Sequence, residues 1–437
     1  MKKIELYQNG SIPGNKIHKD LAITTLTTQN LSNYYEFSNL KSIYQNNVPY
    51  VEYYESEIPS KKAVIVVPGG GDTYITYDPE ASEAIKFWKQ KKDVSIFVLI
   101  YRTVLFQNNL SEFTTNPYDV FNMNAAFFLA FYDMYHTLEL VKRLCKTCIT
   151  MHGFSNGGFL VSSFLSIYLY NQNLVQDILS IVDTSSQYQN SVSPAFQNLV
   201  QKYTNAEYEF QNISSPVQCQ ILHYPITDQS IPQQPTALSE LGLFTNFLIT
   251  FYPDAITPLT LLFSNKLYSD GVSDPVNFIA NYSLIQDNYV PTYLVHTLSD
   301  PLIQNTIPNL FIKWLNEKNI PNVKQTFSYG GHGWGMGYGF PKTSTFPENL
   351  YPNNFYDNFY EPPSSFYGTD GVNGSYQLGN SSVWYKPPFS NSNLKKSLYD
   401  FLEQFFMVSA CSVSENQTKA NKVITRRLKN PLRLPSL

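Results

Sequence analysis

Short, continuous runs of apolar residues alternate with longer amphipathic stretches from about Lys61 onward. Continuous apolar runs bounded by turn residues are typical of buried strands, whereas apolar positions every three or four residues are typical of helices. The pattern predicts strands at 63–67, 94–101, 149–153, 218–226, 291–298 and 323–330. It predicts helices at 82–90, 122–144, 159–170, 306–318 and 394–406. Alternating strands and helices favour an α/β fold with a mostly parallel central sheet flanked by helices.

Four internal or terminal segments interrupt this alternation. Residues 1–60 are predicted to form an N-terminal arm before a main domain at 61–410. Within that domain, residues 185–290 are predicted to be a cap-like insertion. Residues 341–389 are rich in Pro, Tyr, Phe, Asn and Gly, and a loop of this length is either functional or poorly ordered. The basic tail at 411–437 is predicted to be disordered, with a membrane- or partner-binding role as the alternative.

Composition narrows the classes of protein that fit. A net charge of -4 over 437 residues gives no electrostatic reason to expect nucleic acid as the main partner. The N-terminus has no apolar signal region and no apolar run reaches membrane-spanning length, so we expect a cytoplasmic protein without a transmembrane segment. The pair Cys145 and Cys148 is interpreted as small buried residues at a helix–strand junction, with a redox or metal role as the alternative.

The stretch MHGFSNGGFL places Ser155 between two glycines, Gly153 and Gly157. An apolar, partly β-branched segment precedes it and a long apolar helix follows. A strand that turns straight into a helix forces a strained conformation at the apex, and glycines on either side remove the side chains that would obstruct it. This G-x-S-x-G spacing is that of a nucleophile elbow, which presents a serine oxygen beside a helix N-terminus. The alternative is a Gly-rich strand–helix turn with an incidental serine.

A serine hydroxyl needs a base to remove its proton, and the base needs a group that orients it. His332 follows a predicted strand among glycines in a loop, which is the setting that a general base requires. The other histidines lie on the arm, on a helix or inside strands, and His296 is interpreted as a satisfied core residue or a support for the site. Asp300 ends a predicted strand at the edge where open α/β sheets place their sites. A turn or helix-capping role is the alternative for Asp300.

Acyl transfer also requires donors for the oxyanion. Gly69, Gly70 and Gly71 follow the first buried strand and free the backbone to point N–H groups at a substrate oxygen. The N–H of Asn156, directly after Ser155, is the expected second donor. A phosphate-binding loop is the alternative for the glycines, but no G-K-[ST] follows them.

Four motifs, VVPGGG, GFSNGG, LVHTLSD and GGHGWGMG, occur in this order behind an opening LYQNGSIPGN. Together they resemble the esterase/lipase α/β-hydrolases related to acetylxylan esterases and bifunctional feruloyl/acetylxylan esterases. The likeness covers roughly residues 60–335 and the closing helix. It implies an α/β-hydrolase fold with a nucleophile, a base, an acid and an oxyanion hole at Ser155, His332, Asp300 and Gly70, Gly71 and Asn156.

The sequence departs from that family at three places. Pro68 stands where many relatives have histidine, Asp72 stands where an aromatic residue is usual, and the insertion after His332 is unlike compact relatives. The resemblance implies a serine hydrolase that cleaves small-molecule or carbohydrate esters with no cofactor and no metal. A prolyl-oligopeptidase-like peptidase and a non-catalytic binding protein on a hydrolase scaffold are the alternatives, and the oligomeric state stays open.

Overall fold

The computed structural model of the chain describes the residues that carry the main sheet and five α-helices. These are residues 1–7, 12–13, 24–27, 41–44, 48–70, 74–103, 123–144, 146–184, 198–199, 201–203, 205–227, 284–297, 303, 306–327, 335–336, 376–377, 384–385 and 398–407. The predicted basic tail lies outside these residues, as do residues 228–283 of the predicted cap-like insertion and most of the predicted loop insertion.

An eight-stranded sheet with the order β1-β4-β7-β5-β8-β9-β10-β11 forms the centre of the protein. Its strands are Lys2–Glu5 (β1), Tyr50–Tyr54 (β4), Lys62–Val67 (β5), Val94–Ile100 (β7), Cys148–Phe154 (β8), Val217–His223 (β9), Thr292–Thr297 (β10) and Asn322–Phe327 (β11). The run from β7 to β11 is parallel throughout. The predicted α/β class with a mostly parallel sheet is confirmed, and each strand predicted from the apolar runs is present.

The segment predicted to be an N-terminal arm contributes two strands to this sheet. β1 pairs antiparallel with β4, and β4 pairs antiparallel with β7. Within β4, Val51 is fully buried and Tyr53 stacks on Phe97 with ring centroids 4.8 Å apart. The prediction that residues 1–60 form an arm separate from the main domain is therefore wrong for β1 and β4. β1 is a four-residue edge strand with one apolar residue, and β4 carries Glu52 at its centre, so neither shows the continuous apolar run of a central strand.

Two smaller sheets accompany the main one. β2 (Thr24–Thr27), β3 (Lys41–Tyr44) and β6 (Tyr74–Thr76) pair antiparallel in that order. Inside the predicted loop insertion, β12 (Tyr376–Gln377) and β13 (Trp384–Tyr385) form a two-residue antiparallel pair.

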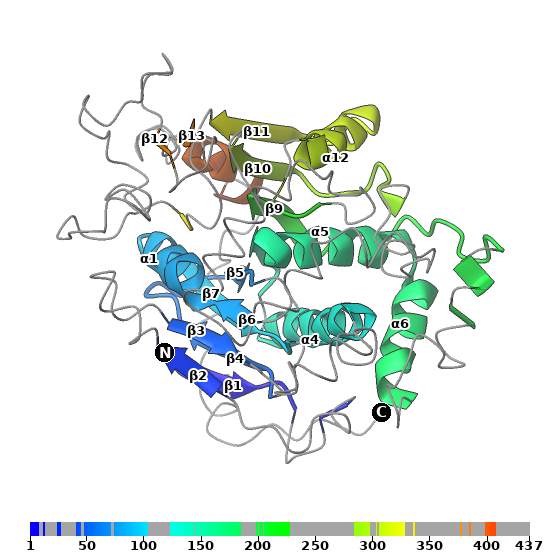
Figure 1. Cartoon of the computed structure of the whole chain (residues 1–437), viewed down its shortest axis with the longest axis horizontal. Coiled ribbons are helices and arrows are strands. Elements are labelled where there is room, and N and C mark those ends of the chain that lie inside the picture. The colour runs from blue at the N-terminus through cyan, green and yellow to red at the C-terminus, as the bar shows by residue number, and fades with distance from the viewer. Residues whose placement is uncertain are drawn as a thin grey trace.

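The described helices lie around the main sheet. They are α1 (Ser82–Lys89), α4 (Met123–Arg143), α5 (Ser155–Tyr170), α6 (Gln172–Thr184) and α12 (Thr306–Glu317). In Figure 1, α4 and α5 lie side by side, and Phe131 contacts Phe164 between them. Residues 398–402 are helical and continue into a π-helical turn, Glu403–Met407, which contacts α1 through Phe406 and Trp88.

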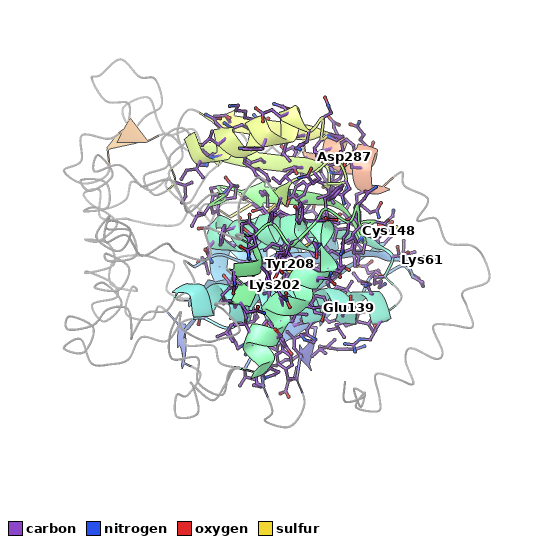
Figure 2. The ribbon with its side chains drawn as sticks, turned by 90° about the vertical axis from the view of Figure 1, so that its right-hand side faces the viewer. Lys61, Glu139, Cys148, Lys202, Tyr208 and Asp287 are labelled. Carbon is purple, nitrogen blue, oxygen red and sulfur yellow. The ribbon has the colours of Figure 1, made fainter. Side chains whose placement is uncertain are left out.

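α5 is the central helix of the fold, and every residue from Ser155 to Leu169 is buried. A helix that is apolar on all sides belongs in the interior, as its sequence predicts. α6 follows it directly and was not predicted. Lys202 and Tyr208, labelled in Figure 2, both donate hydrogen bonds to Asp177 Oδ2 on α6, at 2.8 and 2.6 Å.

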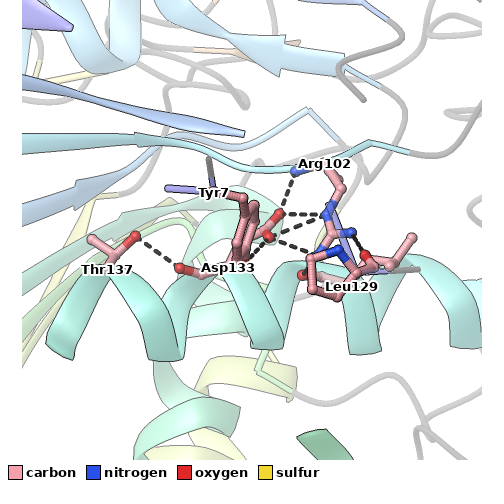
Figure 3. A network of polar contacts seen from close by, with 6 residues as sticks. Tyr7, Arg102, Leu129, Asp133 and Thr137 are labelled. Carbon is pink, nitrogen blue, oxygen red and sulfur yellow. Dashed lines mark hydrogen bonds and ion pairs between the residues drawn. The ribbon is translucent and has the colours of Figure 1, made fainter. Parts of the chain in front are cut away.

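A buried ion pair joins the N-terminal segment to the core (Figure 3). Arg102 follows β7, and its guanidinium donates to both oxygens of Asp133 on α4 at 2.7 to 3.1 Å. Both side chains are fully buried. Tyr7 donates its hydroxyl to Asp133 Oδ1 at 2.8 Å, and Pro13 accepts a hydrogen bond from the guanidinium through its carbonyl. The segment before β2 is therefore held by polar contacts as well as by strand pairing.

Cys148 begins β8 and is disulfide-bonded, with its partner outside the described residues. Its predicted burial is confirmed at 4% exposure, but the interpretation as a merely small residue is wrong. In the described part of the chain, no helix has both the length and the apolar character needed to cross a membrane.

Candidate active site

Ser155 lies at the sharp turn between β8 and α5. Its φ of 48° is in the left-handed region, which a non-glycine residue enters only at a cost of about 1–3 kcal/mol. The preceding residue, Phe154, is extended, so the chain changes from strand to helix within one residue. Such strain persists only where the surroundings impose it. The predicted strand–elbow–helix geometry is therefore present at Ser155.

Two glycines allow this turn to pack. A Cβ on Gly157 would lie 2.2 Å from the carbonyl oxygen of Val67, and a Cβ on Gly153 would lie 2.6 Å from the carbonyl oxygen of Gly157. Both obstacles are backbone atoms, which cannot move aside as a flexible side chain can. The spacing of the G-x-S-x-G motif thus has a steric cause in the contact between the elbow and β5. Together with the sheet order, the elbow gives the α/β-hydrolase fold.

The loop after β5 runs directly beside Ser155. A Cβ on Gly69 would lie 2.7 Å from the Cβ of Ser155, so only glycine permits this approach. The carbonyl of Pro68 accepts a hydrogen bond from the hydroxyl of Tyr101 at 3.0 Å. The carbonyl of Gly69 accepts one from the N–H of Thr76 at 2.9 Å. This loop is therefore fixed by contacts on both sides of the glycine that touches the elbow.

The N–H of Gly69 does not point to a substrate oxygen. It donates instead to Oε2 of Glu80, at 2.5 Å. Because the carboxylate of Glu80 accepts this hydrogen bond, the N–H of Gly69 is not a donor for a substrate oxygen, and Gly70, Gly71 and Asn156 stay the expected oxyanion donors. Gly70 has a φ of 129°, a conformation that favours glycine, and Asn156 is 2% exposed at the start of α5. Gly71 lies outside the described residues.

Asp300 and His332 also lie outside the described residues, so the site is described here without them. The chain on either side of them is described. β10 ends at Thr297 and β11 ends at Phe327, at the same edge of the sheet as the elbow, because both strands are parallel to β8 through β9. The sheet therefore directs both loops to the edge where open α/β folds bind ligands.

The chain just after His332 is anchored at two consecutive backbone amides. The N–H of Gly335 donates to the hydroxyl oxygen of Tyr224 at 2.9 Å, and the N–H of Met336 donates to Oε2 of Glu83 at 2.9 Å. The carbonyl of Gly335 lies 3.2 Å from Nδ1 of His223. These contacts hold the loop against α1 and the end of β9.

Glu80 and Tyr224 were not recognised from the sequence as parts of the site. Glu80 follows Asp78 and Pro79 in the sequence, as an acid near the start of a helix often does, but it is 1% exposed. Its Oε1 accepts a hydrogen bond from the hydroxyl of Tyr224 at 3.0 Å. One signal existed in the sequence: Glu80, Glu83 and the buried Phe87 share a helical face at spacings of three and four.

Three histidines on strands are core residues, as expected. His152, His223 and His296 are all fully buried. Burial lowers the pKa of His223 to about 3, although its contact with Gly335 opposes the shift. Burial, followed by the nearby His223, lowers the pKa of His152 well below its ordinary value. Both rings are therefore neutral at pH 7, and Nδ1 of His152 accepts a hydrogen bond from the indole of Trp88 at 3.1 Å.

The described site contains one strained serine, a glycine loop against it, and two buried carboxylates that bind backbone amides of neighbouring loops.

No family model matches the chain, and no curated protein matches it. Solved structures with a similar arrangement include a carboxylesterase from Lactobacillus plantarum, at 14% identity over 72% of this chain and 86% of that one, with a TM-score of 0.39.

Two further solved structures show the same level of likeness. An acetyl ester-xyloside bifunctional hydrolase from Caldicellulosiruptor lactoaceticus is 19% identical over 77% of this chain and 88% of that one, with a TM-score of 0.40. An esterase from the Planctomycetes species Thermogutta terrifontis is 11% identical over 71% and 85%, with a TM-score of 0.37. Likenesses at this level do not bear on activity.

Proposed function

We propose that the protein is a serine hydrolase that cleaves carboxylic esters through an acyl-enzyme. The observation that carries the proposal is the backbone of Ser155, which is held at a φ of 48° against the glycine loop after β5. A strained serine at a strand–helix turn serves no packing purpose that alanine or glycine would not serve better. Its value lies in presenting the hydroxyl at the sheet edge.

In the proposed reaction, Ser155 Oγ attacks the ester carbonyl while His332 accepts its proton, and Asp300 orients the imidazole. The backbone N–H groups of Gly70, Gly71 and Asn156 stabilise the oxyanion. Collapse of the tetrahedral intermediate expels the alcohol, which takes the proton from His332. Water then attacks the acyl-enzyme by the reverse sequence of proton transfers.

Support for His332 comes from the length of the chain that follows it. Gly335 is three positions after it, so the two Cα atoms are at most roughly 11 Å apart. Gly335 is anchored to Tyr224, which bonds to Glu80, and Glu80 bonds to the loop beside Ser155. This series of hydrogen bonds between the two loops supports His332 as the base for Ser155. The substrate class we propose is a small-molecule or carbohydrate ester.

Fluorophosphonate labelling tests the nucleophile directly. We expect the wild-type protein to label at Ser155, identified by peptide mapping, and to hydrolyse short p-nitrophenyl esters. Ser155→Ala should abolish both and change the free energy of unfolding by no more than about 1 kcal/mol, because the change is small.

Ser162, on the same helix, provides the matched control, since its hydroxyl bonds only to the backbone carbonyl of Phe159. Ser162→Ala should keep full labelling. Labelling that persists in Ser155→Ala would assign the nucleophile elsewhere. A wild-type protein that neither labels nor hydrolyses esters or peptides would favour the non-catalytic alternative, and cleavage of peptides alone would favour the peptidase.

A further inference from the structure

A continuous chain of hydrogen bonds runs through the interior from one loop of the site to another. The N–H of Gly69 donates to Glu80 Oε2 at 2.5 Å, the hydroxyl of Tyr224 donates to Glu80 Oε1 at 3.0 Å, and the N–H of Gly335 donates to the Tyr224 oxygen at 2.9 Å. A backbone N–H can only donate, so the Tyr224 oxygen accepts from Gly335 and its proton is available for Glu80. The donor and the acceptor of each of the three hydrogen bonds are thereby fixed.

Each end of this chain touches a loop that the proposed reaction uses. Gly69 begins the glycine loop and packs against Ser155, with 2.7 Å between its Cβ position and the Cβ of Ser155. Gly335 lies three residues after His332. Glu83, one helical turn beyond Glu80, adds a second anchor through the N–H of Met336. The chain therefore links the proposed oxyanion hole to the loop of the proposed base.

The hydrogen-bonded groups of Glu80 and Tyr224 are unusual for a purely structural core. Glu80 and Tyr224 are 1% and 0% exposed, and a buried carboxylate is commonly no more stabilising than a well-packed apolar residue. Tyr224 has a φ of 37°, although it is a bulky residue, so its backbone is also strained. Strain and buried charge at one place persist where function requires a fixed geometry.

We propose that Glu80 and Tyr224 are positioning residues that set the distance between the glycine loop and the loop after His332. The proposal rests on the proposed function. Their hydrogen bonds to Gly69 and Gly335 act on the two loops and not on the substrate. By accepting a hydrogen bond from the N–H of Gly69, Glu80 fixes the backbone of the glycine loop beside Ser155. By binding Gly335, Tyr224 ties the histidine loop to the same carboxylate.

Tyr224→Phe tests this with the loss of one oxygen atom. Without the hydroxyl, Glu80 and the N–H of Gly335 each lose a partner, and the two loops are no longer joined. We expect kcat for a short acetate ester to fall by roughly 10- to 100-fold with KM nearly unchanged, since small misplacements of catalytic groups have effects of this size. The rate of fluorophosphonate labelling should fall in parallel.

Tyr289→Phe is the matched control. The Tyr289 hydroxyl is also buried and makes two comparable hydrogen bonds, donating to the carbonyl of Ser162 at 3.0 Å and accepting from Gln220 at 3.1 Å. Neither partner belongs to the two loops. The two variants should therefore lose similar thermal stability, while only Tyr224→Phe loses turnover. Equal turnover in the two variants would overturn the positioning role.

Amide hydrogen exchange tests the link between the two loops independently of the proposed esterase activity. Amide hydrogen exchange in Tyr224→Phe should quicken in the peptide that contains Gly69, which Tyr224 does not contact directly, as well as in the peptide that contains Gly335. Tyr289→Phe should quicken neither. Unchanged exchange at Gly69 would refute the link even if the protein proved inactive on esters. An inactive wild-type protein with coupled exchange would instead refute the esterase proposal alone.

Glu80→Gln completes the test, because glutamine keeps the shape but offers one acceptor oxygen where two donors converge. If Glu80 and Tyr224 act through one chain, the double variant should lose little more turnover than the more damaged single variant. Fully additive losses would show two independent effects and would overturn the shared path.

Discussion

The backbone of Ser155 stores strain that its side chain does not explain. A φ of 48° is open to glycine at little cost, whereas any residue with a Cβ is disfavoured there. Glycines at 153 and 157 relieve contacts around the turn, but the apex itself keeps a serine. The strain is thus concentrated at the one position whose hydroxyl the proposed reaction needs.

This strain predicts an unusual order of stability. Ser155→Gly should unfold with a free energy about 1 kcal/mol higher than Ser155→Ala, because glycine relaxes the left-handed conformation. Both variants lack the hydroxyl, so urea unfolding monitored by fluorescence compares the relief of backbone strain with the larger entropy of glycine in the unfolded chain. An alanine variant as stable as the glycine variant would mean that the strain at the turn does not exceed this entropy cost.

Between elements, the N-terminal segment depends on the ion pair of Arg102 and Asp133. Burial alone would lower the pKa of Arg102, but the adjacent Asp133 outweighs it and the pKa is raised. Burial, followed by the charge of Asp133, raises the pKa of Tyr7 well above its ordinary value. The network therefore holds a charged arginine, a carboxylate that accepts hydrogen bonds, and a neutral tyrosine hydroxyl.

Removing one partner of this buried pair should be costly. Asp133→Ala is expected to lower the free energy of unfolding by about 3–5 kcal/mol, because Arg102 stays buried without its counter-charge. Thr137→Ala, which removes only a hydroxyl bonded to the Asp133 carbonyl at 2.8 Å, should cost about 1 kcal/mol. Urea unfolding measures both.

A double replacement distinguishes charge from packing. Arg102→Met with Asp133→Leu should recover most of the loss of Asp133→Ala, since apolar residues of similar volume often replace a buried pair without penalty. A double variant as unstable as Asp133→Ala would mean that the network acts through shape or backbone contacts and not through charge.

For the whole molecule, buried neutral histidines make stability depend on pH. Burial, together with Arg143 and Arg102, lowers the pKa of His136 to about 4. Burial lowers the pKa of His223 to about 3 and that of His152 well below its usual range. Between these values and the ordinary pKa near 6.5, the unfolded chain binds protons that the folded protein does not.

The free energy of unfolding should therefore fall as pH decreases from about 6.5 towards 4. His136→Phe keeps an aromatic ring against Tyr132, whose centroid is 4.5 Å away, and removes one titrating group. Its urea unfolding curves between pH 7 and 4 should show a shallower loss of stability than the wild type. Parallel pH dependence in both proteins would show that His136 does not contribute.

Much of the fold and part of the candidate site could be predicted from local patterns. Strands β7 and β8 are buried at every position and β5 at every position but its first, and strands buried on both faces are mostly apolar in sequence. The elbow at Ser155 could be found because its glycines are separated by fixed steps along the chain. Asp300 and His332 stay predictions, since they lie outside the described residues.

Other features depended on partners distant in the sequence. Tyr224 and Glu80 are 144 positions apart, and no local pattern around either residue predicts the hydrogen bond between them. The same holds for β4, which joins the sheet beside β7, and for Gly69, whose N–H is taken by Glu80. The sequence by itself determined the alternating elements and the position of the elbow, because periodicity and glycine spacing report how each segment is buried. Only the tertiary structure decided which polar groups meet inside, because a hydrogen bond between distant residues depends on where the folded chain brings each donor and acceptor.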